Sequence, residues 1–481
     1  MQISELSPLL KLLPEMIVAS LGLVLLMVDA FVKRKEVVAG LALAGALAAF
    51  FSLKFGDFGV VFGGMFISDG YSVFFKLIFF INLILSIMIS GRYLKDENSL
   101  HGEYYCLLVF STLGMMVMAS AGNLITLYLG LELMALSTYV LAGFVRHDTK
   151  STEAAVKYFL TGGFSTALLL YGISLLYGVT GSMDLRTIAA YIAQHGVSGN
   201  PMALLSLVLL SCAFAFKIAA VPFHMWVPDV YEGAPTPVTA FMSIGPKAAG
   251  FAVLGRVFLY ALSNMSVEWS LILSVLSILT MCVGNVMALV QTNIKRMLAY
   301  SSVAHAGYAL IGIVAATPEG LSATMNYLFI YTFMNIGAFS VVLMLHTKDF
   351  KALEISDYAG LGKTHPILGA AMLVFMFSLT GIPPMAGFIG KFYVFMSAVR
   401  SGYLWLAILA VIFSVISAFF YLRVVMYMYM KEPQRPGMEL TSSHAIGAAL
   451  AVCATFVLLI GVMPERFVEF AKAAVKMLYF Q

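Results

Sequence analysis

The sequence predicts an all-α, polytopic membrane protein. Apolar residues make up 61% of the 481 residues and charged residues only 11%, whereas soluble domains contain about 25% charged residues. A membrane span takes about 20 residues, so the apolar residues suffice for about 14 spans. The apolar runs are continuous and do not alternate with polar residues, which argues against a membrane β-barrel.

Apolar runs bounded by charges, glycine or proline define 14 expected membrane helices. A further short helix that lies on the membrane surface is expected at 464–479, where charged and apolar residues alternate. The 14 expected spans are 9–32, 37–54, 71–92, 103–120, 123–145, 153–180, 202–225, 237–262, 268–290, 299–317, 320–346, 366–398, 401–430 and 442–463.

The distribution of basic residues predicts the orientation in the membrane. Fifteen Lys and Arg residues fall in the loops on one side and seven on the other, and the positive-inside rule makes the richer side cytoplasmic. Both termini are then expected on the outer side of the membrane. The fifteen are Lys33, Arg34, Lys35, Arg92, Lys95, Arg146, Lys150, Lys157, Lys295, Arg296, Lys348, Lys351, Lys363, Lys431 and Arg435.

Two of the expected helices contain internal prolines. Residues 202–236 include Pro222, and residues 366–398 include the pair Pro383-Pro384. A proline inside a helix removes a backbone hydrogen bond and breaks or kinks the helix. The two broken helices are the seventh and the twelfth, and a repeat of five helices is inverted because five is odd.

This pattern divides the chain into four expected units. They are an N-terminal unit of helices 1–3 (1–102), a first repeat of helices 4–8 (103–262), a second, inverted repeat of helices 9–13 (263–430), and helix 14 with the amphipathic segment (431–481).

Several ionisable residues fall deep inside the expected helices, where a charge costs at least about 2.5–3.5 kcal/mol. Such residues favour a proton relay that faces a water-filled interior. The alternative for each is a static ion pair or a bridge between helices. The candidates are Glu132, Lys217, Lys247, Lys391, His305 and His224.

Other charged residues are weaker candidates. Glu153 and Lys157 form an ordinary i,i+4 pair by their spacing, and Asp229 is expected as a cap in irregular backbone near the cytoplasmic face; these three are secondary candidates for the relay. Lys76 and Arg256 are expected to pair structurally or to extend toward the membrane surface.

The sequence argues against several other chemistries. The four cysteines are 70 or more residues apart, and neither a CxxC nor a GxGxxG motif is present, so we expect no metal, flavin or nucleotide in this chain. With a net charge of +4 and no large basic cluster, nucleic-acid binding is not expected. No aromatic cage or polar cluster is expected at mid-depth.

Three long motifs resemble one known family. They are residues 216–250, which include Val221-Pro222-Phe223-His224, residues 293–305, and residues 381–392. They are similar to the proton-conducting membrane subunits of respiratory complex I, which share a family with subunits of multi-subunit cation/proton antiporters. The resemblance covers roughly residues 60–430.

Within that family the chain is most similar to the subunit N group of bacterial NADH–quinone oxidoreductases. Helix 12 carries Lys391, where subunit M relatives have a glutamate. The chain ends after helix 14, without the long lateral helix of subunit L relatives. The segment 153–165, Glu-Ala-Ala-Val-Lys-Tyr-Phe-Leu-Thr-Gly-Gly-Phe-Ser, is also typical of subunit N.

The resemblance implies roles for the buried residues. Glu132 and Lys217 would form a pair on helices 5 and 7, and Lys247 would link two half-channels. Lys391 would belong to the half-channel that delivers protons to the outside.

The same resemblance implies that His305 and His224 line a central hydrophilic axis. The redox chemistry would take place elsewhere, with NAD, FMN, iron–sulfur clusters and quinone held by partner subunits and none of them by this chain. The expected partners are other membrane-arm subunits, including homologous antiporter-like subunits, and the lipid bilayer.

Two alternatives stay open at this point. The chain could be a sodium/proton antiporter subunit of a multi-subunit cation antiporter, or a structural spacer whose central charges are static pairs. Sodium-dependent proton exchange without a redox substrate would identify the first. Loss of assembly, with flux little changed, on replacement of the charges would identify the second.

Overall fold

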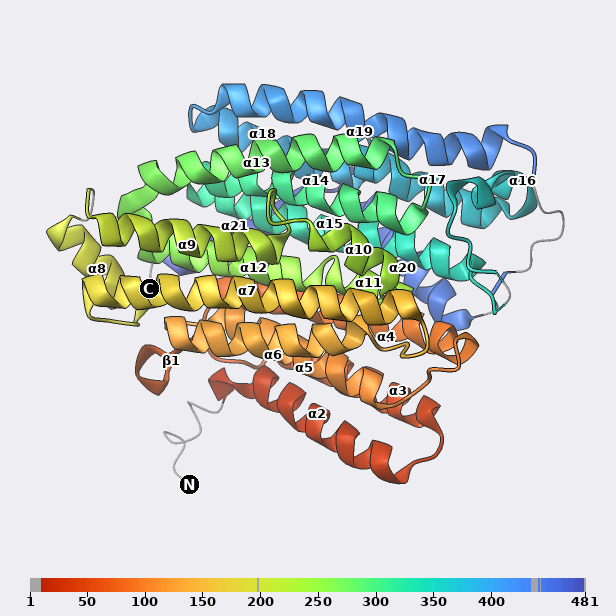
Figure 1. The fold of residues 1–481 in the computed structure, drawn as a ribbon, viewed down its shortest axis with the longest axis horizontal. Coiled ribbons are helices and arrows are strands. Elements are labelled where there is room, and N and C mark those ends of the chain that lie inside the picture. The colour runs from red at the N-terminus through yellow and green to blue at the C-terminus, as the bar shows by residue number, and fades with distance from the viewer. Residues whose placement is uncertain (1–9, 197–198, 349, 434–439, 442, 480–481) are drawn as a thin grey trace.

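The computed structural model describes residues 10–196, 199–348, 350–433, 440–441 and 443–479. In these residues, 13 helices are long and apolar enough to cross a membrane. A shorter apolar helix, Pro366–Thr380, continues after a break into a second short helix, which gives a fourteenth span in two pieces. Most spans run roughly parallel (Figure 1). The predicted all-α membrane fold is confirmed.

The membrane spans follow the expected order. The N-terminal unit has three helices: α2 (Leu13–Phe31), α3 (Lys35–Ser52) and α4 (Gly70–Asp96). The first repeat contains α5 (Glu103–Ser120), α6 (Leu124–Ala142), α7 (Thr149–Thr180), the broken span α9 (Pro201–Ile218) with α10 (Trp226–Gly233), and the span built from α11 (Thr236–Met242), α12 (Gly245–Leu254) and a π-helix (Gly255–Ala261).

The second repeat contains α13 (Ser266–Leu289), α14 (Ile294–Val314), α15 (Pro318–Leu345), the broken span α17 (Pro366–Thr380) with α18 (Ala386–Arg400), and α19 (Leu404–Met430). Helix α20 (His444–Val462) is the last span, and the amphipathic helix α21 (Glu465–Tyr479) follows it as expected. Short 3₁₀ segments (Phe62–Gly64, Ser263–Met265, Ile355–Tyr358) and α16 (Leu361–Thr364) lie in loops.

Two elements outside the spans were not expected from the sequence. Strands β1 (Gly59–Val61) and β2 (Phe66–Ser68) pair antiparallel, with Val60 opposite Ile67. Helix α8 (Leu185–His195) is capped by Asp184, which accepts hydrogen bonds from two backbone N–H groups of the first turn. Both elements are shorter than a membrane span, so a search for long apolar runs passes over them.

The backbone hydrogen bonds that join the start of α6 to a later loop have the same pattern as those at the start of α14. The N–H of Leu124 donates to Met183 O, and the N–H of Leu185 donates to Gly122 O. In the second repeat, Ile294 donates to Leu353 O and Ile355 donates to Thr292 O. Asn123 and Asn293 precede these helices and cap them. The two repeats therefore share a local design at corresponding positions.

The breaks in the two interrupted spans also match. Each first half ends in a residue with left-handed backbone, Ala219 (φ 65°) or Gly381 (φ 93°). The next residue, Ala220 or Ile382, donates its N–H to the carbonyl five residues earlier, which is the Schellman pattern that ends helices. The proline follows three residues after the left-handed residue in both, so the predicted inverted repeat is present with its broken helices.

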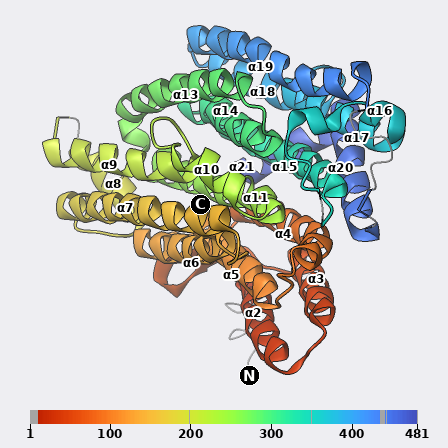
Figure 2. The same cartoon turned by 45° about the vertical axis from the view of Figure 1, so that its right-hand side comes forward.

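The most deeply buried spans lie at the centre of the molecule. In the apolar stretch of each span, 100% of the residues are buried in Thr236–Ala261 and in Ile294–Val314, and 94% are buried in Pro318–Leu345. In the peripheral helices α7 and α19 the share is 33%. Figure 2 shows α14 and α15 enclosed by other helices. Side chains of these central spans are therefore hidden from lipid.

Two buried ion pairs fasten α4 and its neighbours. The Nζ atom of Lys76 lies 2.7 Å from Glu15 Oε1, and Nη2 of Arg256 lies 2.7 Å from Asp69 Oδ1. All four side chains are at least 92% buried. The expected structural role of Lys76 and Arg256 is confirmed.

The loops that join odd to even spans are connected by ion pairs on one face of the molecule. Because each pair bridges two loops, the basic residues in these pairs share that face; Arg435 lies outside the described residues. The bridging pairs are Lys95–Glu36, Lys351–Glu97, Lys351–Asp148, Lys150–Glu232, Arg296–Glu232 and Lys363–Glu432.

The strongest part of this network lies beside the broken span. Asp229 on α10 binds Lys157 Nζ at 2.8 Å and Arg296 Nη1 at 3.0 Å, and Glu232 binds Arg296 at 2.9 Å. Burial raises the pKa of the Asp229 carboxyl, but the hydrogen bonds and charges of Lys157 and Arg296 outweigh it and hold the pKa below its usual value of 3.8. The pKa of Glu232 is lowered for the same reason, with Lys150 and Arg296 as the cations.

We predict that this network stabilises the fold fully above about pH 5 and progressively less as the pH falls below 4. A carboxyl whose pKa is lowered on folding contributes stability above its ordinary pKa, and the contribution is lost as the pH falls through the lower value. At pH 7, Asp229→Asn with Glu232→Gln should lower the free energy of unfolding by about 1–2 kcal/mol, because exposed pairs contribute little. The unfolding midpoint of the detergent-solubilised protein measures this.

The control is Glu36→Gln, because the Glu36–Lys95 pair is 3.9 Å long and its side chains are more than 60% exposed. This change should leave the midpoint unaltered. If the unfolding midpoints of the wild type and the double variant differ by the same amount at pH 7 and at pH 3.5, the network does not stabilise the fold through its carboxylates.

Candidate functional site

Four of the ionisable side chains predicted to form the relay are buried in or beside the central spans. Lys217 on α9, Lys247 on α12, His305 on α14 and Lys391 on α18 are between 2% and 5% exposed. A charged group in such surroundings needs polar partners or must give up its charge. The partners of each one therefore decide what the group can do.

Lys217 lies at the end of α9, two residues before the left-handed Ala219. Its Nζ atom is buried and has no hydrogen-bond partner among the described residues. The nearest ring is that of Phe216, whose centroid is 5.6 Å away. An ammonium group without a partner is the least satisfied cation of the site and the one most in need of water or a mobile partner.

Glu132 on α6 is half-buried and accepts a hydrogen bond of 2.7 Å from Thr166 on α7. Its charge acts on Lys217, but the two side chains do not appear among the ion pairs of 4.0 Å or less in the described residues. The structure therefore brings the expected partners into electrostatic range without direct contact.

Lys247 lies in the first turn of α12 and reaches across to α14. Its Nζ atom donates to both the carbonyl and the Oγ atom of Ser302, each at 2.8 Å. Beside it is a cavity of about 10 Å³, also lined by His305, Tyr327 and Tyr331, which is the size of about one water molecule. Lys247 and His305 therefore both line one water-sized space.

His305 has hydrogen-bond partners on both ring nitrogens. Nδ1 lies 2.5 Å from the hydroxyl of Tyr327, and Nε2 lies 3.0 Å from the hydroxyl of Tyr421. Tyr421 continues to Ser301 Oγ at 2.5 Å. Hydroxyls can donate or accept, so either neutral tautomer of the imidazole can be accommodated.

Lys391 lies in α18, just after the break in the twelfth span. Its Nζ atom donates to Thr380 O at 2.7 Å, Leu379 O at 3.1 Å and Ser414 Oγ at 2.9 Å. The two carbonyls end α17 and have no partner within that helix, and a cation at a helix C-terminus is stabilised by the helix dipole. The break in the span thus creates the binding place of the lysine.

The remaining predicted residues lie at or near the ion-paired face described above. His224 is half-buried in the break after α9, and its Nδ1 atom is buried without a partner among the described residues. Lys157 binds Glu153 at 2.6 Å and Asp229 at 2.8 Å. Glu153, Lys157 and Asp229 therefore meet in one charged network, and Asp229 is more than the cap expected from the sequence.

Tyrosines surround His305, which corrects the expectation that mid-depth lacks clustered aromatic and polar groups. The ring centroid of Tyr331 is 4.9 Å from that of His305, and those of Tyr327 and Tyr308 are each 5.9 Å away. The ring centroid of Tyr308 also lies 4.8 Å from the Nζ atom of Lys391. The signal in the sequence was the i,i+4 spacing of Tyr327 and Tyr331, which puts both tyrosines on one face of α15.

The arrangement suits proton transfer better than static pairing. Lys247 and Lys391 bind carbonyl and hydroxyl oxygens, which accept hydrogen bonds from a neutral amine as well as from an ammonium group. No carboxylate among the described residues forms an ion pair with them that would fix their charge. Loss of a proton can therefore occur with most of the contacts kept.

Comparison with known proteins identifies the family of this chain. Residues 121–417 match the family described as "NADH:quinone oxidoreductase/Mrp antiporter, TM". The chain is 49% identical over 471 residues to "NADH-quinone oxidoreductase subunit N" of Trichlorobacter lovleyi, with 97% of each chain covered.

Solved structures agree with this assignment. A chain of respiratory complex I from Thermus thermophilus with bound aureothin superposes with a TM-score of 0.82 at 32% identity, covering 96% of this chain and 100% of the other. A chain of the Mrp complex from Dietzia sp. gives a TM-score of 0.84 at 21% identity, with 98% of each covered, and shows the shared fold alone. The chain belongs to the subunit N family of NADH-quinone oxidoreductases and is a membrane subunit of that translocase complex.

Proposed function

We propose that this chain carries protons across the membrane through a relay of Glu132, Lys217, Lys247, His305 and Lys391, driven by quinone reduction in other subunits. The observation that carries the proposal is the line of buried cations whose partners are neutral oxygens or, for Lys217, absent. A structural spacer has no need of cations left unpaired in the membrane, because each costs several kcal/mol.

The first step of the proposed path uses the gap between Glu132 and Lys217. When the two side chains approach, the carboxylate favours the ammonium form of Lys217; when they separate, the ammonium loses its only acidic neighbour and gives up a proton. The unpartnered Nζ atom of Lys217 corresponds to the separated arrangement. His224, beside the same break, supplies a second acceptor on the cytoplasmic side.

The next steps run through α12, α14 and α18. Lys247 passes the proton across the water-sized cavity to His305. The last transfer runs from His305 to Lys391, past Tyr308, which lies near both residues. Moving one charge against a potential costs about 2.3 kcal/mol per 100 mV, and pairing changes in a low-dielectric interior can supply that amount.

We further propose the surroundings of the chain. It would lie in a bacterial inner membrane with its ion-paired face toward the cytoplasm and both termini outside. Other membrane-arm subunits, including homologous antiporter-like ones, would flank it, while NAD, FMN, iron–sulfur clusters and quinone would bind to partner subunits. The basic residues on the ion-paired face and the membership in the subunit N family support these assignments.

We predict that Glu132→Ala and Lys217→Ala each abolish most proton pumping while assembly survives, because each removes one side of the first pair. Proton uptake per NADH oxidised by the complex in sealed vesicles measures the effect. The control is Glu15→Gln with Lys76→Met, which replaces a buried ion pair outside the relay and should leave the ratio unchanged. A normal ratio in either relay variant would remove the basis for these roles.

The same vesicles test the antiporter alternative. With no redox substrate present, an imposed sodium gradient should cause no proton movement through this complex. Sodium-dependent proton exchange that Lys217→Ala abolishes would replace the proposed function with sodium/proton antiport.

A second prediction separates a relay from static charges. Lys247→Arg keeps a positive charge, but a guanidinium does not release its proton in proteins. We expect Lys247→Arg to lower the pumping rate at least tenfold, as Lys247→Ala does, whereas Ser302→Ala, which keeps the carbonyl acceptor, should cost only a few-fold. If Lys247→Arg pumps normally in an assembled complex, the charge of Lys247 is structural.

A further inference from the structure

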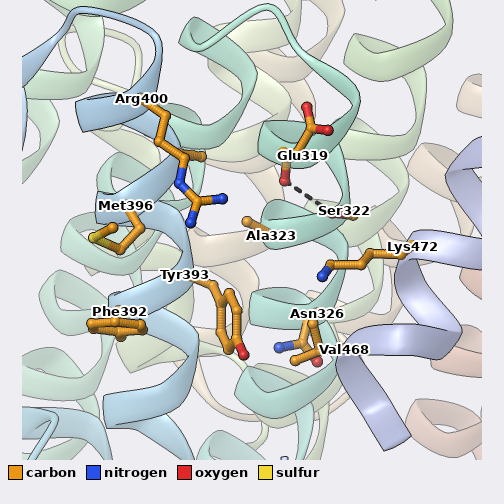
Figure 3. Close-up of a pocket in the computed structure, with 11 residues that line it drawn as sticks. Glu319, Ser322, Ala323, Asn326, Phe392, Tyr393, Met396, Arg400, Val468 and Lys472 are labelled. Atoms are coloured by element: carbon orange, nitrogen blue, oxygen red, sulfur yellow. Dashed lines mark hydrogen bonds between the residues drawn. The ribbon is translucent and has the colours of Figure 1, made fainter. Parts of the chain in front are cut away.

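A pocket apart from the relay lies where the first turns of α15, the last turns of α18 and the amphipathic helix α21 meet (Figure 3). Its volume is about 140 Å³. It lies at the membrane end that the basic-residue count assigns to the outside. None of the residues given a role in the relay lines it.

The charged groups of the pocket favour an anion. The guanidinium of Arg400 and the ammonium of Lys472 point into the pocket from opposite sides, while the carboxylate of Glu319 points away from its centre (Figure 3). Neither cation forms an ion pair with any described residue. Two unpaired cations that converge on one space match the charge of a phosphate group.

The floor of the pocket holds a second sign of a polar ligand. Asn326 is 2% exposed, and neither its amide nitrogen nor its amide oxygen has a hydrogen-bond partner among the described residues. A buried amide without partners costs several kcal/mol. The side chain faces the pocket below Lys472 (Figure 3), so a polar group that enters there can satisfy it.

An apolar groove adjoins this pocket. It runs between α18 and α19, has a volume of about 570 Å³, and is lined by residues such as Phe388, Leu404, Ile408 and Val411. Phe392 and Met396 line both the groove and the charged pocket. One ligand can therefore occupy both, with a polar end between the cations and an apolar end in the groove.

The length of the groove fits half a bilayer. It is lined along α18 from Phe388 to Val399, next to Arg400 of the pocket. Twelve residues of helix rise about 18 Å, and half of the hydrocarbon core is about 15 Å thick. A phosphate beside Arg400 would thus place an acyl chain along the whole groove.

We propose that this pocket and groove bind one anionic phospholipid of the outer leaflet, with its phosphate between Arg400 and Lys472 and an acyl chain between α18 and α19. The ligand is a lipid and not free phosphate, because the apolar groove continues from the charged pocket. Lys391 of the proposed relay lines the inner part of the groove, but no relay residue lines the charged pocket, so lipid binding at the pocket can fail or succeed separately from the proton path.

The test counts lipid that stays bound to the assembled complex. The complex is exchanged into nanodiscs of equal phosphatidylglycerol and phosphatidylcholine and purified again in mild detergent, and the retained phosphatidylglycerol is quantified by mass spectrometry. Arg400→Gln with Lys472→Gln should retain one molecule fewer per complex than the wild type. The matched control, Lys54→Gln with Lys476→Gln, removes two exposed cations outside the pocket and should retain the wild-type number.

A photoreactive residue in place of Ile408 gives an independent measurement in case the double variant assembles poorly. Labelling of phosphatidylglycerol from this position, lost in the presence of Arg400→Gln alone, supports the site. Equal lipid retention in the pocket and control variants overturns the proposal, as does a crosslink from Ile408 to another polypeptide instead of lipid. Displacement of the lipid by millimolar inorganic phosphate alone would also overturn it, because the groove would then contribute nothing.

Discussion

The absence of water in the membrane interior governs this structure. Every backbone group and every charge there must find its partner within the protein. The buried pairs Lys76–Glu15 and Arg256–Asp69 meet this demand with direct opposite charges. Lys247 and Lys391 meet it with carbonyls and hydroxyls, and Lys217 does not meet it with any described residue. The chain thus contains buried cations held by direct ion pairs and buried cations whose described partners are neutral or absent.

The two inverted repeats use one backbone plan for different chemistry. Glu132 lies nine residues after the capping residue Asn123, and Ser302 lies nine residues after the corresponding Asn293. The first repeat places a carboxylate at this position, within electrostatic range of Lys217. The second places there the serine that binds Lys247. The same position in the repeat provides a charged neighbour in one half and a neutral partner in the other.

Much of the fold could be predicted because apolar length and proline position are local properties of the sequence. The spans, the breaks at Pro222 and Pro383-Pro384 and the amphipathic helix after residue 464 follow from them. Helix α8 and the β1–β2 pair could not be found in this way, since they are short and lie outside the spans. The buried ionisable residues stood out by the cost of charge in lipid.

Their partners could not be predicted, because contacts between helices depend on rotation about each helix axis. The tyrosines that bind His305 come from two other spans, α15 and α19, and the carbonyls that bind Lys391 become available only because its own span is broken. Asp229 was expected as a cap, and its two cations come from α7 and α14. A single sequence shows which of these groups are present but not which of them are in contact.

The most direct test of the account is a density map of the assembled complex at a resolution that shows ordered water. The account predicts water molecules that join Lys217 to Lys247 and Lys247 to His305, with a continuous hydrogen-bonded path on to Lys391. A dry, closed interior, with Lys217 sealed off from Lys247 by apolar side chains, would contradict it.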